Sequence, residues 1–369
     1  MSKPLIRYLV SSPHGDIPAD EHKWDLPLEG DALETPYRIY FDSIREFLSK
    51  DEFRPFLSLI SEKNRRRIFI DEVDELIIRT EKHGLFYHPA SIELILKDGK
   101  VKFGLNVAVS DMGRHWLEEE LNVLQKLHAK YDLPYLPKVY MFGEFNDMSF
   151  LLEDWFEGYH ELHISKDHNG NQRLKLWDFC HGYKYLSSEQ SFEIYNQASK
   201  ILTLYYNLDD FSEISPWHHA AGDFVVKIMD STVDVRLTTA RRYEPFVGFL
   251  DQDTLNPVLA LCYYLLNLTI RMRLDKLDGL GEVVWMDDGC VEATLQGFFE
   301  ALKLKGDLTN SIGKAEEYLI LLRSFSVDDL KTLVSPLLEQ YRVTGDFPVI
   351  ISNLDKHIEE IHVTLQTLP

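Results

Sequence analysis

Residues 73–154 carry the pattern that most restricts the fold of this chain. Strand-like runs of apolar and β-branched residues occupy 73–79, 91–96, 101–109, 138–144 and 148–154. Between the third run and the fourth, residues 114–130 have helical spacing, with one apolar face made of Trp116, Leu117, Leu121, Leu124 and Leu127. The order of three strands, one helix and two strands predicts a small β-rich lobe over residues 71–154.

Two short turn sequences predict how these strands are joined. Lys97-Asp98-Gly99-Lys100 separates the second run from the third. Asp-Gly between two β-rich runs is typical of a type I′ hairpin, in which both central residues need a positive φ. Asn146-Asp147 separates the last two runs in a similar way. We therefore expect an antiparallel sheet whose second and third strands pair around Asp98-Gly99.

The residues on either side of this lobe differ from it in composition and in hydrophobic pattern. Residues 1–35 are rich in Pro, Gly and acidic groups and predict an extended arm. Helical spacing at 37–67 completes an N-terminal segment over residues 1–70. Residues 155–369 predict a larger, mainly helical lobe with a helix near 190–208, a β-hairpin near 223–240, an amphipathic helix over 265–278, and a single candidate strand in the C-terminal third at 347–352. The expected fold class is α+β with two lobes.

Composition narrows the classes of partner. The net charge of −21 repels phosphate backbones, so we expect no nucleic-acid partner, and Arg65-Arg66-Arg67 is the only dense basic run. The uncharged stretch from Thr254 to Ile270 is too short to span a bilayer comfortably, so we expect no membrane partner. The three cysteines, Cys180, Cys262 and Cys290, form no C-x-x-C pair, which suits a reducing compartment. With no signal peptide visible after Met1, we expect a cytoplasmic protein.

Two motifs resemble the aminoglycoside phosphotransferase and choline-kinase group. Residues 133–144 read LPYLPKVYMFGE and residues 150–158 read FLLEDWFEG, which are similar to the family patterns "lP-x-v-l-x-f-G-e" and "fLLmEylxG". The resemblance implies a two-lobed protein-kinase-like fold, with the second motif running from the fifth strand into the hinge between the lobes. It also implies ATP and Mg²⁺ as cofactors, with the backbone of Glu153, Asp154 and Trp155 facing the adenine ring.

The predicted helix at 114–130 adds to the resemblance. Glu120, Leu124 and Leu127 have the E-x-x-x-L-x-x-L spacing of the family's small-lobe helix, although Glu118 and Glu119 leave the register open. In the family this Glu holds a strand lysine that grips the α- and β-phosphates. Here the lysine position falls on Asn106 or on Ser110, and neither residue is a cation. Lys102 lies on the same face of the strand as Asn106 and is a candidate substitute. The family's glycine-rich loop is also absent, since residues 79–90 contain only Gly84.

The segment 216–226, PWHHAAGDFVV, has the length of the family's catalytic pattern H-G-D-x-x-x-G-N-x-x-V. The match puts His218 at the general-base aspartate and Asp223 at the metal-binding asparagine. Thr238 or Thr239 replaces the family's second metal ligand, an aspartate. His218 and Asp223 are therefore the candidate catalytic residues, and Asp223 is also a weak candidate metal ligand. His218, His219 and Asp223 also fit either part of a metal site or a self-contained polar loop.

These replacements predict a degraded phosphotransfer site. The leading interpretation is a pseudokinase that binds a nucleotide, a metabolite or a protein partner in the cleft between the lobes, with Lys102, Glu120 and Glu153 to Trp155 as candidate nucleotide contacts. One alternative is an active small-molecule phosphotransferase, or a kinase-fold transferase of altered chemistry that uses His218 and Asp223. The other alternative is an interaction protein with a closed cleft. The sequence does not give the ligand, because specificity depends on sites grafted onto a fold.

Overall fold

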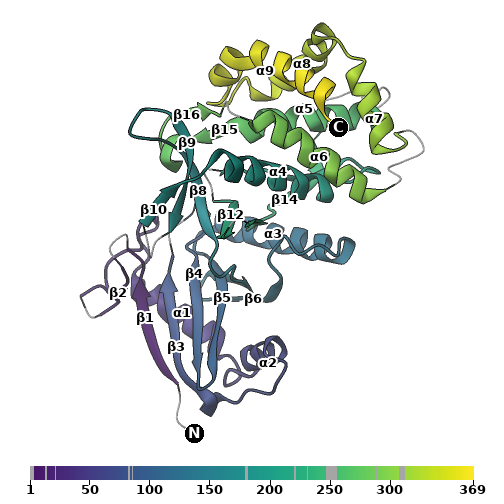
Figure 1. Cartoon of the computed structure of the whole chain (residues 1–369). Helices are drawn as coiled ribbons and strands as arrows, with labels where there is room; N and C mark the ends of the chain where they lie inside the picture. Colours follow the sequence, from purple (N-terminus) through teal and green to yellow (C-terminus); the bar gives the residue numbers. More distant parts are fainter. Residues whose placement is uncertain are drawn as a thin grey trace. The chain divides into compact units, whose positions relative to one another are not determined.

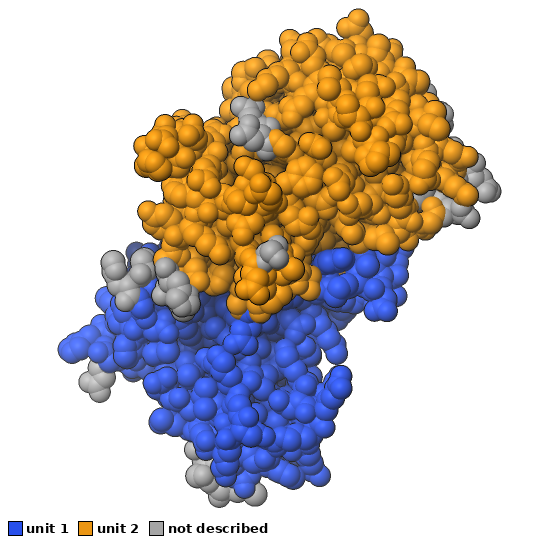
Figure 2. All heavy atoms as spheres, viewed as in Figure 1, with its two compact units in different colours: residues 1–157 blue, residues 158–369 orange. Residues whose placement is uncertain are grey.

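The computed structural model describes residues 4–12, 15–20, 22–81, 84, 86–178, 182–219, 222–230, 232–246, 256–286, 289–306 and 312–369. Cys180, Ala220, Ala221 and Thr254, which belong to features discussed above, lie outside these ranges. The described chain is α+β, as predicted, with several antiparallel sheets (Figure 1). It divides into two compact units, residues 1–157 and residues 158–369 (Figure 2).

Unit 1 contains the predicted order of three strands, one helix and two strands. Its elements are β1 (Leu5–Val10), β2 (Ile17–Pro18), α1 (Tyr37–Ser49), α2 (Arg54–Lys63), the short 3₁₀ helix η1 (Ile70–Glu72), β3 (Val73–Thr80), β4 (Ala90–Leu96), β5 (Gly99–Ala108), α3 (Asp111–Lys130), β6 (Val139–Phe145) and β7 (Met148–Asp154). The strands form one sheet in the order β2-β1-β3-β4-β5-β7-β6. The N-cap Ser110 starts α3 by accepting a hydrogen bond from the Gly113 N–H.

The hairpin between β4 and β5 is present, but its turn differs from the predicted one. Leu96 pairs with Gly99, so Lys97 and Asp98 are the two turn residues and Gly99 already belongs to the strand. None of these turn residues has a positive φ, so the turn is not type I′. The Asp98 carboxylate is held by the Arg66 guanidinium at 2.9 and 3.0 Å. The positive φ pair that type I′ requires is found instead at Asn146 (53°) and Asp147 (59°), between β6 and β7.

The prediction of an extended arm over residues 1–35 is wrong for its first strand. β1 pairs in parallel with β3 and extends the sheet of unit 1. Helix α1 packs against the other end of the same sheet, where the rings of Phe47 and Phe150 stack with centroids 4.9 Å apart. Gly143 permits this approach, because a Cβ there would lie 2.9 Å from the Phe47 ring. The N-terminal segment is therefore part of the core of unit 1.

Unit 2 contains more β structure than the sequence predicted. Its elements are β8 (His160–Lys166), β9 (Gln172–Asp178), β10 (Gly182–Tyr185), α4 (Ser188–Tyr205), β11 (Ser212–Ser215), β12 (Phe224–Met229), β13 (Thr232–Leu237), β14 (Arg242–Pro245), α5 (Pro257–Arg273), β15 (Leu274–Lys276), the 3₁₀ helix η4 (Leu277–Gly279), β16 (Val283–Trp285), α6 (Cys290–Lys305), α7 (Ala315–Arg323), α8 (Val327–Tyr341) and α9 (Phe347–Thr367). Five of the strands form a sheet in the order β10-β9-β8-β12-β13.

The structure of unit 2 decides three expectations drawn from the sequence: a hairpin, a strand and a helix. The hairpin near 223–240 is confirmed as β12 and β13. The candidate strand at 347–352 is wrong, because Pro348 at the start of α9 suits the first turn of a helix. The helix expected over 265–278 ends at Arg273, and the chain continues into β15. Within the described ranges, no helix combines the length and the apolar character needed to cross a membrane.

Candidate functional site

The position of the family's phosphate-binding lysine is filled by an amide in unit 1. Asn106 lies in β5, and its Nδ2 donates a hydrogen bond of 3.0 Å to Oε1 of Glu153 in β7. Glu120, on α3, is fully buried and lies near enough to repel the Glu153 carboxylate. Burial, and then the charge of Glu120, raise the pKa of Glu153 well above its ordinary value. Burial and the nearby charge of Glu120 therefore favour the protonated form of Glu153, which accepts its hydrogen bond from Asn106.

Asp154 is held by residues of its own unit. Its Oδ1 accepts hydrogen bonds from Lys63 Nζ at 2.8 Å and from the Tyr140 hydroxyl at 2.6 Å. The Tyr140 pKa is raised, chiefly by burial and then by this hydrogen bond. Asp154 Oδ2 also accepts the Lys138 N–H at 3.1 Å. The side chain thus ties β7 to α2 and to the residue before β6.

The expectation that the backbone of residues 153–155 faces an adenine ring does not hold for the first two. Glu153 pairs with Gly104 on one side and with Val139 on the other, so its backbone lies within the sheet. The Asp154 N–H donates to the Lys138 carbonyl at 3.0 Å. Only Trp155 lies beyond the end of β7. The sequence match implied that the hinge begins at Glu153, whereas strand β7 continues through Asp154.

Lys102 and Trp155, both predicted as nucleotide contacts, contact each other. The Lys102 ammonium lies 4.1 Å from the centre of the Trp155 ring, which is a cation–π geometry. Burial is the main reason why the pKa of Lys102 is lowered. Lys102, the candidate substitute for the family's lysine, therefore already contacts an aromatic ring.

Asp223, the central candidate of unit 2, is a buried ion-pair partner. It is 1% exposed. Its Oδ1 lies 2.9 Å from Nη2 of Arg241, and its Oδ2 lies 3.2 Å from Nη1. The His218 backbone N–H also donates to Oδ2 at 2.9 Å. Both carboxylate oxygens are therefore engaged by donors from the chain, which leaves Asp223 poorly placed to act as a base or a metal ligand.

The two histidines of the loop have different surroundings. His219 is a core residue, 3% exposed, with its ring edge-on to those of Tyr195 and Trp217. Burial, followed by the charge of His218, lowers the His219 pKa to about 3. His218 is only partly buried, and its pKa is lowered by burial and then by Arg271. The expectation that both imidazoles serve one polar site is wrong for His219.

The threonines that replace the second metal aspartate fix the same loop. The Thr238 N–H donates to the Asp223 carbonyl at 2.8 Å, and its hydroxyl donates to the Gly222 carbonyl at 3.1 Å. Thr239 is buried. The end of β13 and the loop before β12 are thus bound to each other through backbone groups. Among the described residues, no group of three or more His, Cys, Asp and Glu side chains could hold a metal ion.

Sequence reasoning missed a polar row on β8 and its partners. Glu161 lies against Gly222, since a Cβ at Gly222 would be 2.9 Å from Oε1 of Glu161. His163 is buried beside Gly279, and the buried Asp275 accepts the Ile164 N–H at 2.9 Å. Burial raises the pKa of Asp275 to about 6. The alternation of apolar and polar residues over 160–166 was the available signal for this strand.

Comparison with known proteins identifies no relative: no family model matches the chain, and no curated protein matches it. The functional argument therefore depends on the geometry of the chain itself.

Proposed function

We propose that this chain is a kinase-like, two-lobed protein of the pseudokinase type, which binds a small molecule or a protein partner without transferring phosphate. The observation that carries the proposal is the Asp223–Arg241 ion pair. Asp223 occupies the metal-ligand position that the resemblance assigns, and an arginine of the same chain supplies the positive charge there. Phosphoryl transfer depends on metal ions that neutralise developing charge, and a guanidinium fixed inside the fold does not move with the substrate.

The strand order of unit 1 and the residue at its expected lysine position support the same proposal. The order β3, β4, β5, α3, β6, β7 agrees with the layout that the resemblance implies. Asn106 replaces the expected lysine and donates to a buried carboxyl group. A site without a cation at this place lacks the contact that holds the phosphates of ATP.

The observations favour binding over catalysis by Asp223. A general base must reach a substrate proton, whereas Asp223 is 1% exposed and both of its oxygens accept hydrogen bonds from the chain. Nucleotides, metabolites and proteins are the proposed partner classes, and the charge of −21 disfavours nucleic acids. We further propose a cytoplasmic location, which the free, buried thiols of Cys262 and Cys290 support.

The test is turnover of labelled ATP with Mg²⁺ by the full chain, compared with the Asp223→Asn variant. Removal of one charge-stabilising group typically costs about 10²–10³ in rate, and several such groups are replaced here. We expect phosphate release no faster than in the variant, against about 1–100 s⁻¹ for kinases. Turnover of about 1 s⁻¹ that Asp223→Asn abolishes would contradict the proposal.

Thermal unfolding with separate ligands then identifies the partner class. A ligand that binds the folded state raises the melting temperature, and the stabilisation grows with the logarithm of its concentration relative to Kd. Stabilisation by Mg·ATP, or by ATP alone, would assign a nucleotide. A panel of metabolites tests the second class, and co-purification from cytosol tests the third. Control melts with Mg²⁺ alone remove effects of the ion.

A further inference from the structure

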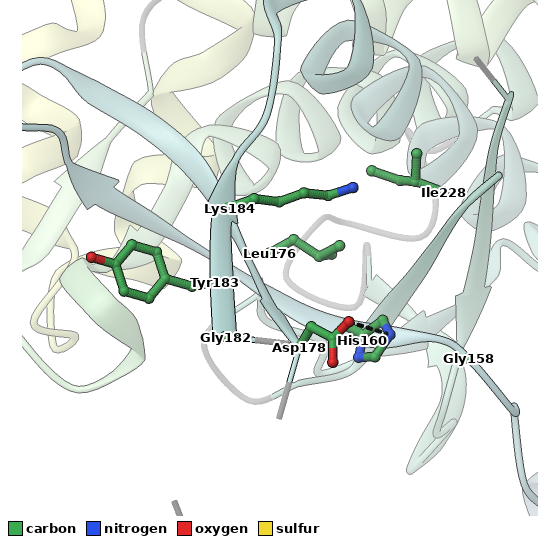
Figure 3. A pocket seen from close by; sticks show the side chains of 8 residues that line it. All are labelled: Gly158, His160, Leu176, Asp178, Gly182, Tyr183, Lys184 and Ile228. Atoms are coloured by element: carbon green, nitrogen blue, oxygen red, sulfur yellow. Dashed lines mark ion pairs between the residues drawn. The ribbon is translucent and has the colours of Figure 1, made fainter. Parts of the chain in front are cut away.

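A hollow on the five-stranded sheet of unit 2 carries chemistry that the proposed function does not use. Its wall comes from β8, β9, β10 and β12, with Leu176 and Ile228 as its apolar part (Figure 3). Its volume is about 240 Å³, smaller than a typical site for a drug-sized ligand, so only a small molecule would fit.

Two of the positions that line the hollow, Gly158 and Gly182, carry no side chain. Gly182 pairs with Asp178 across β10 and β9, and Gly158 precedes β8 beside His160. Both glycines have positive φ, 77° at Gly158 and 88° at Gly182, which other residues adopt only with strain. Side chains are therefore disfavoured at these two positions of the lining.

Opposite charges stand at the two ends of this hollow. At one end, Nε2 of His160 lies 3.7 Å from Oδ2 of Asp178. At the other end is Lys184, which pairs across the strands with Leu176 and follows Gly182 by two residues. Two residues of a strand span about 7 Å, and Figure 3 shows Leu176 between the lysine and the carboxylate. Within the described part of the chain, Lys184 has no ion-pair partner.

We propose that this hollow binds an ω-amino acid, a small zwitterion whose ammonium and carboxylate lie at opposite ends of a short aliphatic chain. The carboxylate pairs with Lys184, the ammonium pairs with Asp178, and the methylene groups lie on Leu176 and Ile228. An α-amino acid has both charged groups bonded to the same carbon and cannot reach both ends. A simple carboxylate or a simple amine satisfies only one end. The site consists of unit 2 residues alone and requires no nucleotide, so it goes beyond the proposed function.

The experiment is isothermal titration calorimetry of the full chain with 4-aminobutyrate, butyrate and butylammonium, which share one aliphatic length. We expect 4-aminobutyrate to bind about tenfold or more tightly than either monofunctional compound, because each lacks one charge-assisted contact. Equal binding of butyrate would reassign the hollow to simple carboxylates, and equal binding of butylammonium would reassign it to amines. Either result, or no heat with any compound at millimolar concentration, would overturn the proposal.

Three variants locate the binding. Lys184→Met and Asp178→Asn each remove one end and should weaken 4-aminobutyrate by about tenfold or more. Lys166→Met is the matched control, since Lys166 pairs with Glu282 at the end of β8 and does not line the hollow, and its affinity should be unchanged. Circular dichroism checks that all three are folded. Weakening by Lys166→Met as large as that by Lys184→Met would place the binding elsewhere. Because ATP turnover is a separate readout, a failure here leaves the proposed function unaffected.

Discussion

Asp223 in unit 2 and Glu153 in unit 1 are both enclosed carboxyl groups, 1% and 8% exposed, but the chain gives them different partners. Asp223 receives two contacts from the Arg241 guanidinium and one from a backbone N–H. Glu153 receives one hydrogen bond from the neutral amide of Asn106 and faces the charge of Glu120. A buried carboxylate is tolerated when it is paired with a cation, and otherwise it takes up a proton.

The difference shows two ways in which the chain compensates the negative charge of a buried carboxyl group. In unit 2 an internal arginine supplies the positive charge, so the aspartate stays charged without a metal ion. In unit 1 no cation is supplied by Asn106, and the raised pKa of Glu153 favours its neutral form instead. The comparison predicts that removal of Arg241 is far more costly than changes around Glu153.

The largest expected effect is that of Arg241→Met. The substitution leaves Asp223 buried and without its cation, which should lower the free energy of unfolding by about 3–5 kcal/mol. Denaturant unfolding of the full chain measures this. The neighbouring Arg242→Met is the matched control, because Arg242 is half-exposed and pairs with the exposed Glu244. Its effect should stay within about 0.5 kcal/mol. Equal effects of the two variants would contradict the role given to Arg241.

A smaller loss is expected from Asn106→Leu, which keeps the approximate volume and removes the amide donor to Glu153 Oε1. Loss of one partner of a buried hydrogen bond costs about 1–3 kcal/mol. The same unfolding experiment measures the change. In a Glu153→Met background the penalty should shrink, because the substitution removes the oxygen that accepts the Asn106 hydrogen bond. An undiminished penalty in that background would mean that Asn106 acts through another neighbour.

Glu153→Gln should change the pH dependence of stability. The pKa of Glu153 is raised in the folded state, so its contribution is fully present below the ordinary value of 4.5 and is lost as pH rises through the folded pKa. The variant lacks this loss and should gain stability relative to the wild type as pH rises from 5 to 8. Melting temperatures of both proteins at the two pH values check this. A difference that shrinks with rising pH would reverse the sign and reject the assignment.

The smallest effect is expected from Lys102→Met. The lost contact with the Trp155 ring is worth about 0.5–1 kcal/mol. Unfolding measurements show the loss, and Lys100→Met, which alters an exposed pair with Glu93, serves as the comparison. If Lys102 gripped a nucleotide, its substitution would also abolish any stabilisation by ATP. We expect that stabilisation to be unchanged.

The sequence predicted the strands of residues 73–154 and the hairpin of β12 and β13, because period-2 patterns and turn residues are local signals. It did not predict β1, whose pairing with β3 joins residues about seventy positions apart. Apolar and polar residues alternate in the sequence of β8, with Leu162 and Ile164 on one face. β8, β9 and β10 were not predicted, because the resemblance implied a mainly helical lobe after residue 154.

The sequence pointed to Asp223 as a candidate but not to the residue that pairs with it. The alignment located Asp223, whereas Arg241 lies eighteen positions later and reaches it only after β12 and β13 turn the chain back. His219 seemed part of a polar loop because its neighbours in sequence are polar or small. Its true neighbours are the rings of Trp217 and Phe224, from the same segment, and of Tyr195, from α4. The contact with Tyr195 depends on tertiary packing and leaves no local pattern.

The central claim is that Arg241, and not a metal ion, balances the charge of Asp223. Isothermal titration of Mg²⁺ with a non-hydrolysable ATP analogue into the wild type and into Asp223→Asn tests it most directly. The account predicts that the two proteins take up Mg²⁺ equally, or not at all, because Asp223 is already bound on both oxygens. Uptake of Mg²⁺ by the wild type that Asp223→Asn removes, with both proteins folded, would contradict it.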